Sequence, residues 1–286
     1  MNGRFRVRGR RLWPSLSQVA GWTVIGLVVG VVPAWGQDDK LPKAEKILEK
    51  SIEGRGGRGA FEKQRTRVSK GTIEVSGAGP SVKGTLEQYE EAPNKKYLVM
   101  DLGPSGKIEV GTDGEVHWDL STQGGANIRT GEEKAISERQ SFFNALLLWK
   151  EQYEKVETVG KEQVDEHPCY KVVMTPKVGA PETVYFDRRT GFPVKLEQVR
   201  KRPTGDITIM IRQEEFKDFD GVQLPCKITR QASSGGQTQT FLTTWQSIEH
   251  NVDIPASRFA LPDAVKAVLE KSKGQAGDAT GKKEGS

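Results

Sequence analysis

The chain has 286 residues, with 43 lysines and arginines, 38 acidic residues and two cysteines. Five of the arginines lie in the first 36 residues, which hold no acidic residue, so the remaining chain carries 38 basic and 38 acidic side chains. That balance excludes the overall basic excess expected of a nucleic-acid-binding protein. The length allows one or two domains with a substantial core.

The first 36 residues have the three regions of a secretory signal peptide. An arginine-rich start is followed by an uncharged apolar run from Ala20 to Val32, and then by Ala34 and Gly36 at the spacing of a cleavage site. The apolar run is shorter than the roughly 20 residues that span a bilayer. The sequence therefore predicts export to the periplasm, cleavage after Gly36 and no permanent anchor. An uncleaved anchor and secretion from the cell are the alternatives.

The stretch GRGGRG, from Gly54 to Gly59, has the letters of the dinucleotide-binding pattern G-x-G-x-x-G. That pattern binds a pyrophosphate when a buried strand precedes it and a helix follows it. Here residues 38–53 carry apolar side chains at intervals of three and four, which predicts a preceding helix instead. Gly54 stands where a left-handed glycine ends such a helix. We therefore expect no nucleotide site here.

Most of the predicted domain, residues 37–268, alternates apolar and polar side chains as half-buried strands do. Asp113-Gly114 marks a hairpin turn, and no strand–helix–strand crossover separates the other strands. The sequence therefore predicts an α+β fold with a mainly meandering antiparallel sheet. The apolar periodicity stops near the C-terminus, which predicts a disordered tail at 269–286.

One long helix is predicted between the strands, at residues 130–153. Phe142, Leu146, Trp149 and Tyr153 follow helical spacing and form one apolar stripe. The stripe either packs on the sheet as ordinary core or covers a cavity between the helix and a curved sheet. The residues alone leave both interpretations open.

No motif predicts catalysis or a metal site. His117, His167 and His250 lie far apart in the chain, without a Cys/His cluster, and no G-x-S-x-G motif occurs. Alternation puts His117 on the polar side of its strand, and adjacent acids such as Glu90-Glu91 read as solvated strand positions. We therefore expect a protein that is not an enzyme and that needs no cofactor and no metal.

Cys169 and Cys226 are an even pair in a chain predicted to be exported, which invites a disulfide. In a meander, three strands separate theirs, so the two cysteines lie about four spacings of ~4.8 Å apart. A disulfide needs Cα atoms within ~7 Å. Alternation also puts Cys169 on a polar face beside Lys171, and Cys226 on an apolar face beside Ile228. We predict that the two thiols are not bonded.

Several motifs occur in a fixed order between Lys43 and Pro262. A helix that ends in glycines precedes the strand KGTIEV, and the central helix precedes YFD and then TGFP. The segments DFDGVQLPCKI and FALP complete the series. This order resembles the LolA/LolB-like superfamily of periplasmic lipoprotein carriers and outer-membrane lipoprotein-sorting proteins. The resemblance implies an incomplete antiparallel barrel, a half-barrel, with helices packed on its concave face. It also implies an apolar cavity that holds acyl chains.

Under this resemblance, the apolar residues of the strands and of the central helix that would face the cavity are the candidate ligand contacts. Ordinary core packing is the alternative role for each. The candidates are Ile73, Val75, Leu98, Met100, Val116, Trp118, Phe142, Leu146, Trp149, Tyr170, Val172 and Met174.

The function implied is that of a periplasmic, non-catalytic binding protein that carries or senses a lipid or an acylated protein. One alternative is an envelope interaction or regulatory domain that binds a protein or peptide on the same fold. A structural domain with a filled core is another. A deep apolar cavity favours a lipid, whereas a shallow groove beside an open strand edge favours a protein partner that adds a strand. No nucleic-acid partner is expected.

Overall fold

A computed structural model describes residues 40–201 and 205–281 of the chain. The predicted signal peptide lies outside these residues. Within them, no helix combines the length and the apolar character needed to cross a bilayer.

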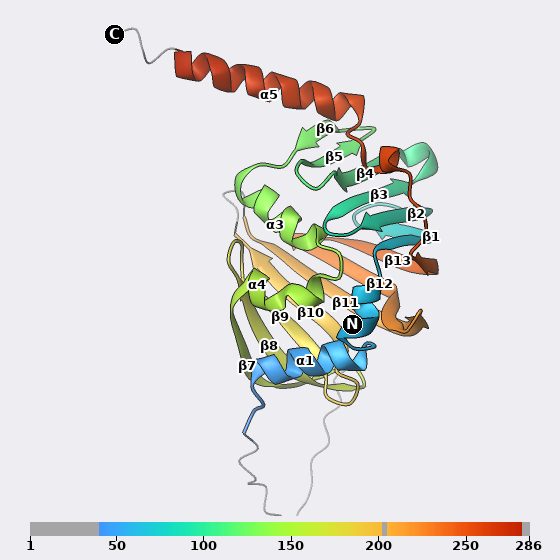
Figure 1. The fold of residues 1–286 in the computed structure, drawn as a ribbon, viewed down its shortest axis with the longest axis vertical. Helices are drawn as coiled ribbons and strands as arrows, with labels where there is room; N and C mark the ends of the chain where they lie inside the picture. Colours follow the sequence, from blue (N-terminus) through green and yellow to red (C-terminus); the bar gives the residue numbers. More distant parts are fainter. Residues whose placement is uncertain (1–39, 202–204, 282–286) are drawn as a thin grey trace, which may run out of the picture. The chain divides into compact units, whose positions relative to one another are not determined.

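The described residues form one antiparallel sheet of 13 strands in the order β6-β5-β4-β3-β2-β1-β13-β12-β11-β10-β9-β8-β7 (Figure 1). Every neighbouring pair is consecutive in sequence except β1 and β13, which join two meanders. The sheet is curved and does not close, because β6 and β7 form its two edges. The predicted α+β half-barrel is confirmed.

The strands have the following bounds. The first meander contains β1 (Thr66–Ser76), β2 (Val82–Glu91), β3 (Lys95–Asp101), β4 (Lys107–Thr112), β5 (His117–Ser121) and β6 (Gly125–Ile128). The second contains β7 (Tyr153–Val164), β8 (His167–Pro176), β9 (Glu182–Asp187), β10 (Pro193–Arg200), β11 (Ile207–Phe219), β12 (Val222–Ser234) and β13 (Gln237–His250).

Cross-strand pairing divides the sheet into two faces, because directly opposed residues project to the same side. One row crosses from β1 to β7 through Val75, Phe241, Arg230, Ile211, Leu196, Val184, Val172 and Thr158. We call this side the inner face. A row on the other side, the outer face, passes through Val68, Tyr89, Tyr97, Gly111, Trp118 and Ile128.

Helices cover part of each face. On the inner face lie α1 (Ala44–Gly54), α3 (Gly131–Ser141) and α4 (Trp149–Gln152) (Figure 1). The apolar stripe of α1 packs on Val172, Met174, Val184 and Phe186, which makes the main core. On the outer face, η3 (Ala256–Phe259) and the start of α5 (Asp263–Gly281) cover a cluster around Tyr97 and Trp118. The remaining short elements are α2 (Arg58–Lys63), η1 (Gly103–Ser105) and η2 (Ala145–Leu148).

The glycines of GRGGRG do more than end a helix. A helix precedes them, as predicted, but the left-handed residues are Gly56 (φ 117°) and Gly57 (φ 78°), not Gly54, and α2 begins at Arg58. Gly54 serves a different need, since a Cβ there would lie 2.3 Å from the carbonyl oxygen of Thr190. Close approach between α1 and the turn after β9 therefore requires a glycine at this position.

The single long helix predicted at residues 130–153 is wrong. α3 ends at Ser141, Phe142 is extended (ψ 127°), and Asn144 is left-handed (φ 53°, ψ 44°). Tertiary contacts hold this break open. The Phe143 N–H donates to the Pro93 carbonyl oxygen at 2.8 Å, and the Asn144 side chain donates to the Phe61 carbonyl oxygen at 2.8 Å. Bonds to distant segments thus replace the helical bonds that the apolar spacing suggested.

The helix α5 continues to Gly281, into the segment for which the sequence predicts a disordered tail. Its first turn is anchored by Val265, which is fully buried on the outer face. Because a helix extends readily once its first turn is fixed, this anchor accounts for helix beyond the last apolar position.

Cys169 and Cys226 are free thiols. As predicted, three strands separate β8 from β12. The prediction of a polar setting for Cys169 is wrong, since its side chain is fully buried in an outer-face cluster with Val164, Tyr185 and Val194. Strand alternation gives the side of the sheet but not which side is covered.

Candidate ligand-binding site

A cavity of about 300 Å³ lies between the inner face and the segment that links α3 to α4. Its apolar wall is formed by Phe61, Phe142, Ala145, Leu146, Leu224, Pro225, Ile228, Trp245 and Ile248. Its polar wall is formed by Arg55, Arg67, Ser69, Gln88, Glu90, Gln140, Asn144 and Gln213. The cavity therefore has one apolar wall and one polar wall, whereas the resemblance implies a uniformly apolar cavity.

A buried ion pair dominates the polar wall. Arg67 on β1 and Glu90 on β2 are directly opposed on the inner face, and Arg67 donates to one Glu90 oxygen from Nε (2.7 Å) and Nη2 (2.6 Å). Lys96 lies 3.5 Å from the other oxygen. Burial raises the pKa of Glu90, but Arg67 and Lys96 outweigh it and lower that pKa to about 2. Glu90 is therefore a buried anion, which corrects its prediction as a solvated strand position.

Arg55 reaches the same cavity from the turn after α1. Its Nε donates to the Gln223 carbonyl oxygen at 3.1 Å, and its guanidinium lies 5.4 Å from the centre of the Phe61 ring. Burial, and the positive charge of Arg67, lower the pKa of Arg55 to about 10. The side chain is therefore still a cation at neutral pH.

Side-chain contacts hold the segment over the cavity at two places, which are the break at Phe142–Asn144 and the end of α3. Arg67 stacks on Phe143 with 5.1 Å between the guanidinium carbon and the ring centre. At the α3 end, Arg139 donates to the Tyr153 hydroxyl at 2.9 Å and to Glu182 at 3.3 Å. The Tyr153 hydroxyl also donates to Glu182. Burial and Glu182 raise the pKa of Tyr153 well above its ordinary value. Polar contacts thus fix α3, whereas the four residues of η2 remain half-buried.

The structure divides the predicted ligand contacts among three places. Phe142 and Leu146 line the cavity. A second group, Ile73, Val75, Leu98 and Met100, forms an apolar cluster farther along the inner face, against Trp245. A third group, Trp149, Tyr170, Val172 and Met174, packs in the core under α1.

Val116 and Trp118 are placed elsewhere, on the outer face beneath η3 and α5. Grouping them with Leu98 as inward-facing residues is wrong. Trp118 is opposed to Gly111, and Gly111 to Tyr97, so Trp118 projects to the side away from Leu98. The room for this ring comes from Gly111, where a Cβ would lie 2.5 Å from it.

No local sequence pattern brings the residues of the polar wall together. Arg67 and Glu90 become partners only through the pairing of β1 with β2. Arg55 is part of the GRGGRG stretch, whose glycines predict a turn and not a binding residue. A usable signal was present, because a charged residue at an inward position of an alternating strand marks a buried polar group.

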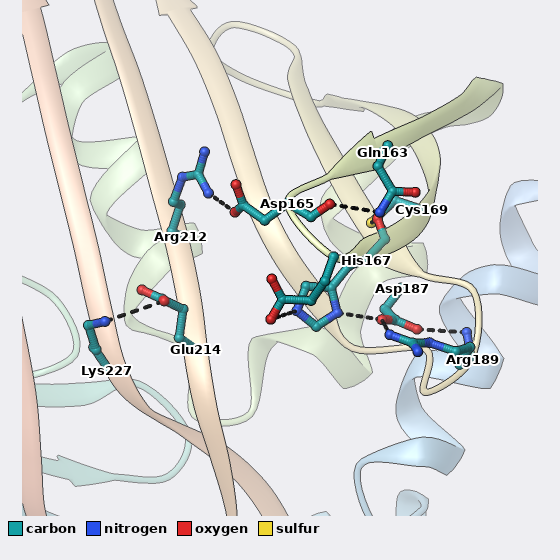
Figure 2. A network of polar contacts seen from close by, with 10 residues as sticks. Gln163, Asp165, His167, Cys169, Asp187, Arg189, Arg212, Glu214 and Lys227 are labelled. Carbon is teal, nitrogen blue, oxygen red and sulfur yellow. Dashed lines mark hydrogen bonds and ion pairs between the residues drawn. The ribbon is translucent and has the colours of Figure 1, made fainter.

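Two of the three histidines, His117 and His167, lie in contacts that belong to the fold. His117 is buried, so its predicted polar setting is wrong; burial lowers its pKa, and its Nε2 has no hydrogen-bond partner among the described residues. The Nδ1 of His167 lies 2.6 Å from Asp187 (Figure 2), which also accepts the backbone N–H groups of Arg189 and Thr190 and so holds the turn after β9. Within residues 40–201 and 205–281, no three His, Cys, Asp or Glu side chains gather as a metal site needs.

Cys169 lies near this network but does not complete a catalytic triad. Its thiol donates to the backbone oxygen of His167 at 3.4 Å, not to the imidazole (Figure 2). Burial, and the charge of Asp187, raise the pKa of Cys169 to about 11. A buried, protonated thiol is a poor nucleophile, and so the network serves the fold.

No protein-family model matches the sequence, and neither does any curated protein. Solved structures do share the architecture. A DUF1329 family protein from Desulfovibrio piger matches with a TM-score of 0.54 at 12% identity, over 76% of this chain and 97% of its own. A LolA superfamily protein from Nitrosomonas europaea gives 0.53 at 14% identity, over 77% and 99%.

A domain assigned to the outer membrane lipoprotein-sorting proteins, from Vibrio parahaemolyticus, gives a TM-score of 0.53 at 13% identity, over 79% of this chain and 99% of its own. Matches at such identities bear on architecture and not on activity. Together with the open sheet and the helices on its inner face, they show that the chain has the LolA-like fold that its motif order predicts.

Proposed function

We propose that this protein is a non-catalytic binding protein of the cell envelope that holds a lipid or an acylated ligand on its inner face. The observation that carries the proposal is the cavity between the sheet and the α3–α4 link. Trp245 lines this cavity and also contacts the apolar cluster of Ile73, Leu98 and Met100. An aliphatic chain in the cavity therefore has an apolar path along the inner face.

The energetics of such binding are favourable. Each CH₂ group that leaves water contributes roughly 0.8 kcal/mol to the binding free energy. Burial of one long aliphatic chain therefore supplies most of the free energy that stable binding needs. The cavity is at the small end of ligand pockets, which range over roughly 300–1,000 Å³. A long chain therefore requires η2 to move outward while α3 stays fixed by Arg139 and Glu182.

The envelope location in this proposal rests on the predicted signal peptide and on the kind of protein with which the fold is shared.

A partner protein that adds a strand is less well supported. The edge strand β7 carries five charged side chains among its 12 residues and has register breaks at Tyr153/Lys155 and Thr158/Gly160. Charges and bulges are the devices that keep edge strands from pairing. The opposite edge, β6, has only four residues.

Native mass spectrometry of residues 37–286, purified from an envelope fraction, tests the proposal. We expect a co-purifying lipid or acylated peptide that organic extraction releases. We also expect its removal to lower the melting temperature and its return to restore it. A clean ligand-free mass, with no stabilisation by any added lipid, would count against lipid binding.

A further inference from the structure

We infer that the cavity takes an amphiphile with an anionic headgroup, a carboxylate or a phosphate on an aliphatic chain, and that Arg55 binds the anionic group. This inference rests on the proposed function and deepens it by naming the ligand class.

The charges that surround the cavity are unequal. Glu90 is the one acidic residue of the described lining, and both of its oxygens are engaged, one by Arg67 and the other by Lys96. The other polar lining residues are serine, asparagine and glutamine, which are neutral. In the described part of the chain, Arg55 forms no ion pair. A surplus of positive charge therefore stands in a partly desolvated space, where an anion from outside is attracted strongly.

The geometry of Arg55 suits this role. Its Nε is used by the Gln223 carbonyl oxygen, and stacking on Phe61 fixes the plane of the guanidinium. Among the described residues, no protein group accepts a hydrogen bond from its two Nη atoms. Those atoms form one edge of the guanidinium fork, which matches the paired oxygens of a carboxylate or a phosphate.

The backbone around Arg55 is built to hold it there. The Arg55 carbonyl oxygen accepts the Gln223 N–H at 3.0 Å. The next residue, Gly56, is left-handed, and a Cβ on it would lie 1.9 Å from the Gly221 carbonyl oxygen. The glycines therefore allow this turn to lie close to the start of β12, and in that position the Arg55 side chain lines the cavity.

The apolar wall shares the same cavity, with Phe142, Leu146 and Trp245 among its residues. A ligand that satisfies both walls carries a charge at one end and an aliphatic chain at the other. Neither a free inorganic anion nor a neutral hydrocarbon uses both.

Isothermal titration of the mature protein with dodecanoate, dodecyl phosphate, dodecanol and inorganic phosphate, all below micelle-forming concentrations, tests the inference. We expect the two anionic amphiphiles to bind at least about tenfold more tightly than dodecanol, the gain expected of a charge-assisted, bidentate contact. Whichever of the two binds more tightly identifies a fatty-acid-like or a phospholipid-like ligand.

Three variants locate the effect. Arg55→Gln should lose the preference for the anionic probes while keeping its affinity for dodecanol, which also shows that the cavity is intact. Arg55→Lys keeps the charge without the fork and should retain part of the preference. Arg65→Gln is the matched control, because Arg65 is exposed and its side chain forms no hydrogen bond or ion pair with the described residues; it should bind as wild type does.

The outcomes separate the two proposals. Equal binding of dodecanol and the anionic probes, or an unchanged preference in Arg55→Gln, overturns the anionic headgroup and leaves lipid binding standing. Inorganic phosphate binding as tightly as dodecyl phosphate keeps the anion site and removes the role of the chain. No binding of any probe overturns both.

Discussion

At the scale of single residues, the buried Glu90 is the group on which the polar wall depends. It is the partner of Arg67 on the opposed strand, and it also faces Lys96. Breaking a buried pair leaves an uncompensated charge and costs more than the pair itself contributes. Glu90 therefore keeps two cations in place beside the ligand cavity.

Glu90→Gln should lower the free energy of unfolding by about 3–5 kcal/mol near neutral pH, since Arg67 then stays buried without its partner. The pKa of Glu90 is depressed in the folded state, to about 2. Its stabilisation is therefore complete above the unfolded pKa of about 4.3 and is lost as the pH falls towards 2. Urea unfolding of both proteins from about pH 6 to pH 2.5 should show the gap closing on acidification.

The control for this experiment is Glu74→Gln on the neighbouring strand β1, whose pair with Lys83 is largely exposed and is expected to contribute less than about 1 kcal/mol. A constant gap between wild type and Glu90→Gln at every pH would contradict the account.

Two glycines of one motif should respond to alanine in opposite directions. Gly54→Ala places a Cβ against the Thr190 carbonyl oxygen and is expected to destabilise by about 1–3 kcal/mol. Gly59 lies in α2 with open space around it, so Gly59→Ala is expected to stabilise by up to about 1 kcal/mol through helix propensity. Chemical denaturation measures both, and losses of equal size would refute the close approach.

At the scale of elements, the segment from α3 through η2 to α4 forms one wall of the cavity, with Gln140, Phe142, Asn144, Ala145 and Leu146 among the lining. The polar cluster of Arg139, Glu182 and Tyr153 fixes α3, whereas η2 carries three half-buried leucines and one side-chain hydrogen bond, from Arg58 to the Leu147 carbonyl oxygen at 3.5 Å. A half-buried turn between the buried Phe143 and Trp149 opens locally at lower cost than the elements that flank it.

Arg139→Met should free α3 by removing its bonds to Glu182 and Tyr153, and should leave Glu182 buried without its cation. We expect hydrogen exchange in 131–141 to speed up by at least about tenfold, with β8 and β9 much less affected. Lys134→Met, an exposed change on the same helix, is the control. Uniform acceleration over the whole sheet would instead mean that the cluster supports global stability and not the position of α3.

At the scale of the whole molecule, the sheet separates the proposed binding face from a face to which we assign only structural contacts among the described residues. Part of the outer face is covered by η3 and the start of α5, which pack on Tyr97 and Trp118. The inner face carries the cavity. Side chains of similar burial should therefore differ in function according to their side of the sheet.

Leu146→Ala should weaken the binding of dodecanol severalfold, since it removes apolar contact area from the cavity wall. Val116→Ala, a matched half-buried position on the outer face, should cost stability without changing affinity. Titration and thermal melting of the two variants separate the effects. Equal losses of affinity would contradict the division into two faces.

The same division explains what could be predicted from the sequence. Alternation predicts strands such as β1 and β12 and the antiparallel meander, because the side-chain period of a strand is local. Alternation does not say which side of the sheet is covered. For this reason the predicted inward position of Trp118 and the predicted polar setting of His117 are both wrong. The break at Phe142–Asn144 is set by bonds to Pro93 and Phe61, far away in the chain. The spacing of apolar residues within a segment does not predict hydrogen bonds to distant parts of the chain.

The seam between β1 and β13 also bears on how the molecule folds. All other strand neighbours are consecutive, so each meander can assemble from local hairpins, while the seam must bring the first and last strands together. Closing so long a loop is an entropic step that slows folding. At the seam, Gly71 leaves no room for a Cβ, which would lie 2.1 Å from the Thr244 carbonyl oxygen. We therefore expect the folding rate to be set at a junction whose two strands also line the cavity, where Ser69 is opposed to Ile248. Until that junction forms, the two halves of the sheet should behave as separate folding units.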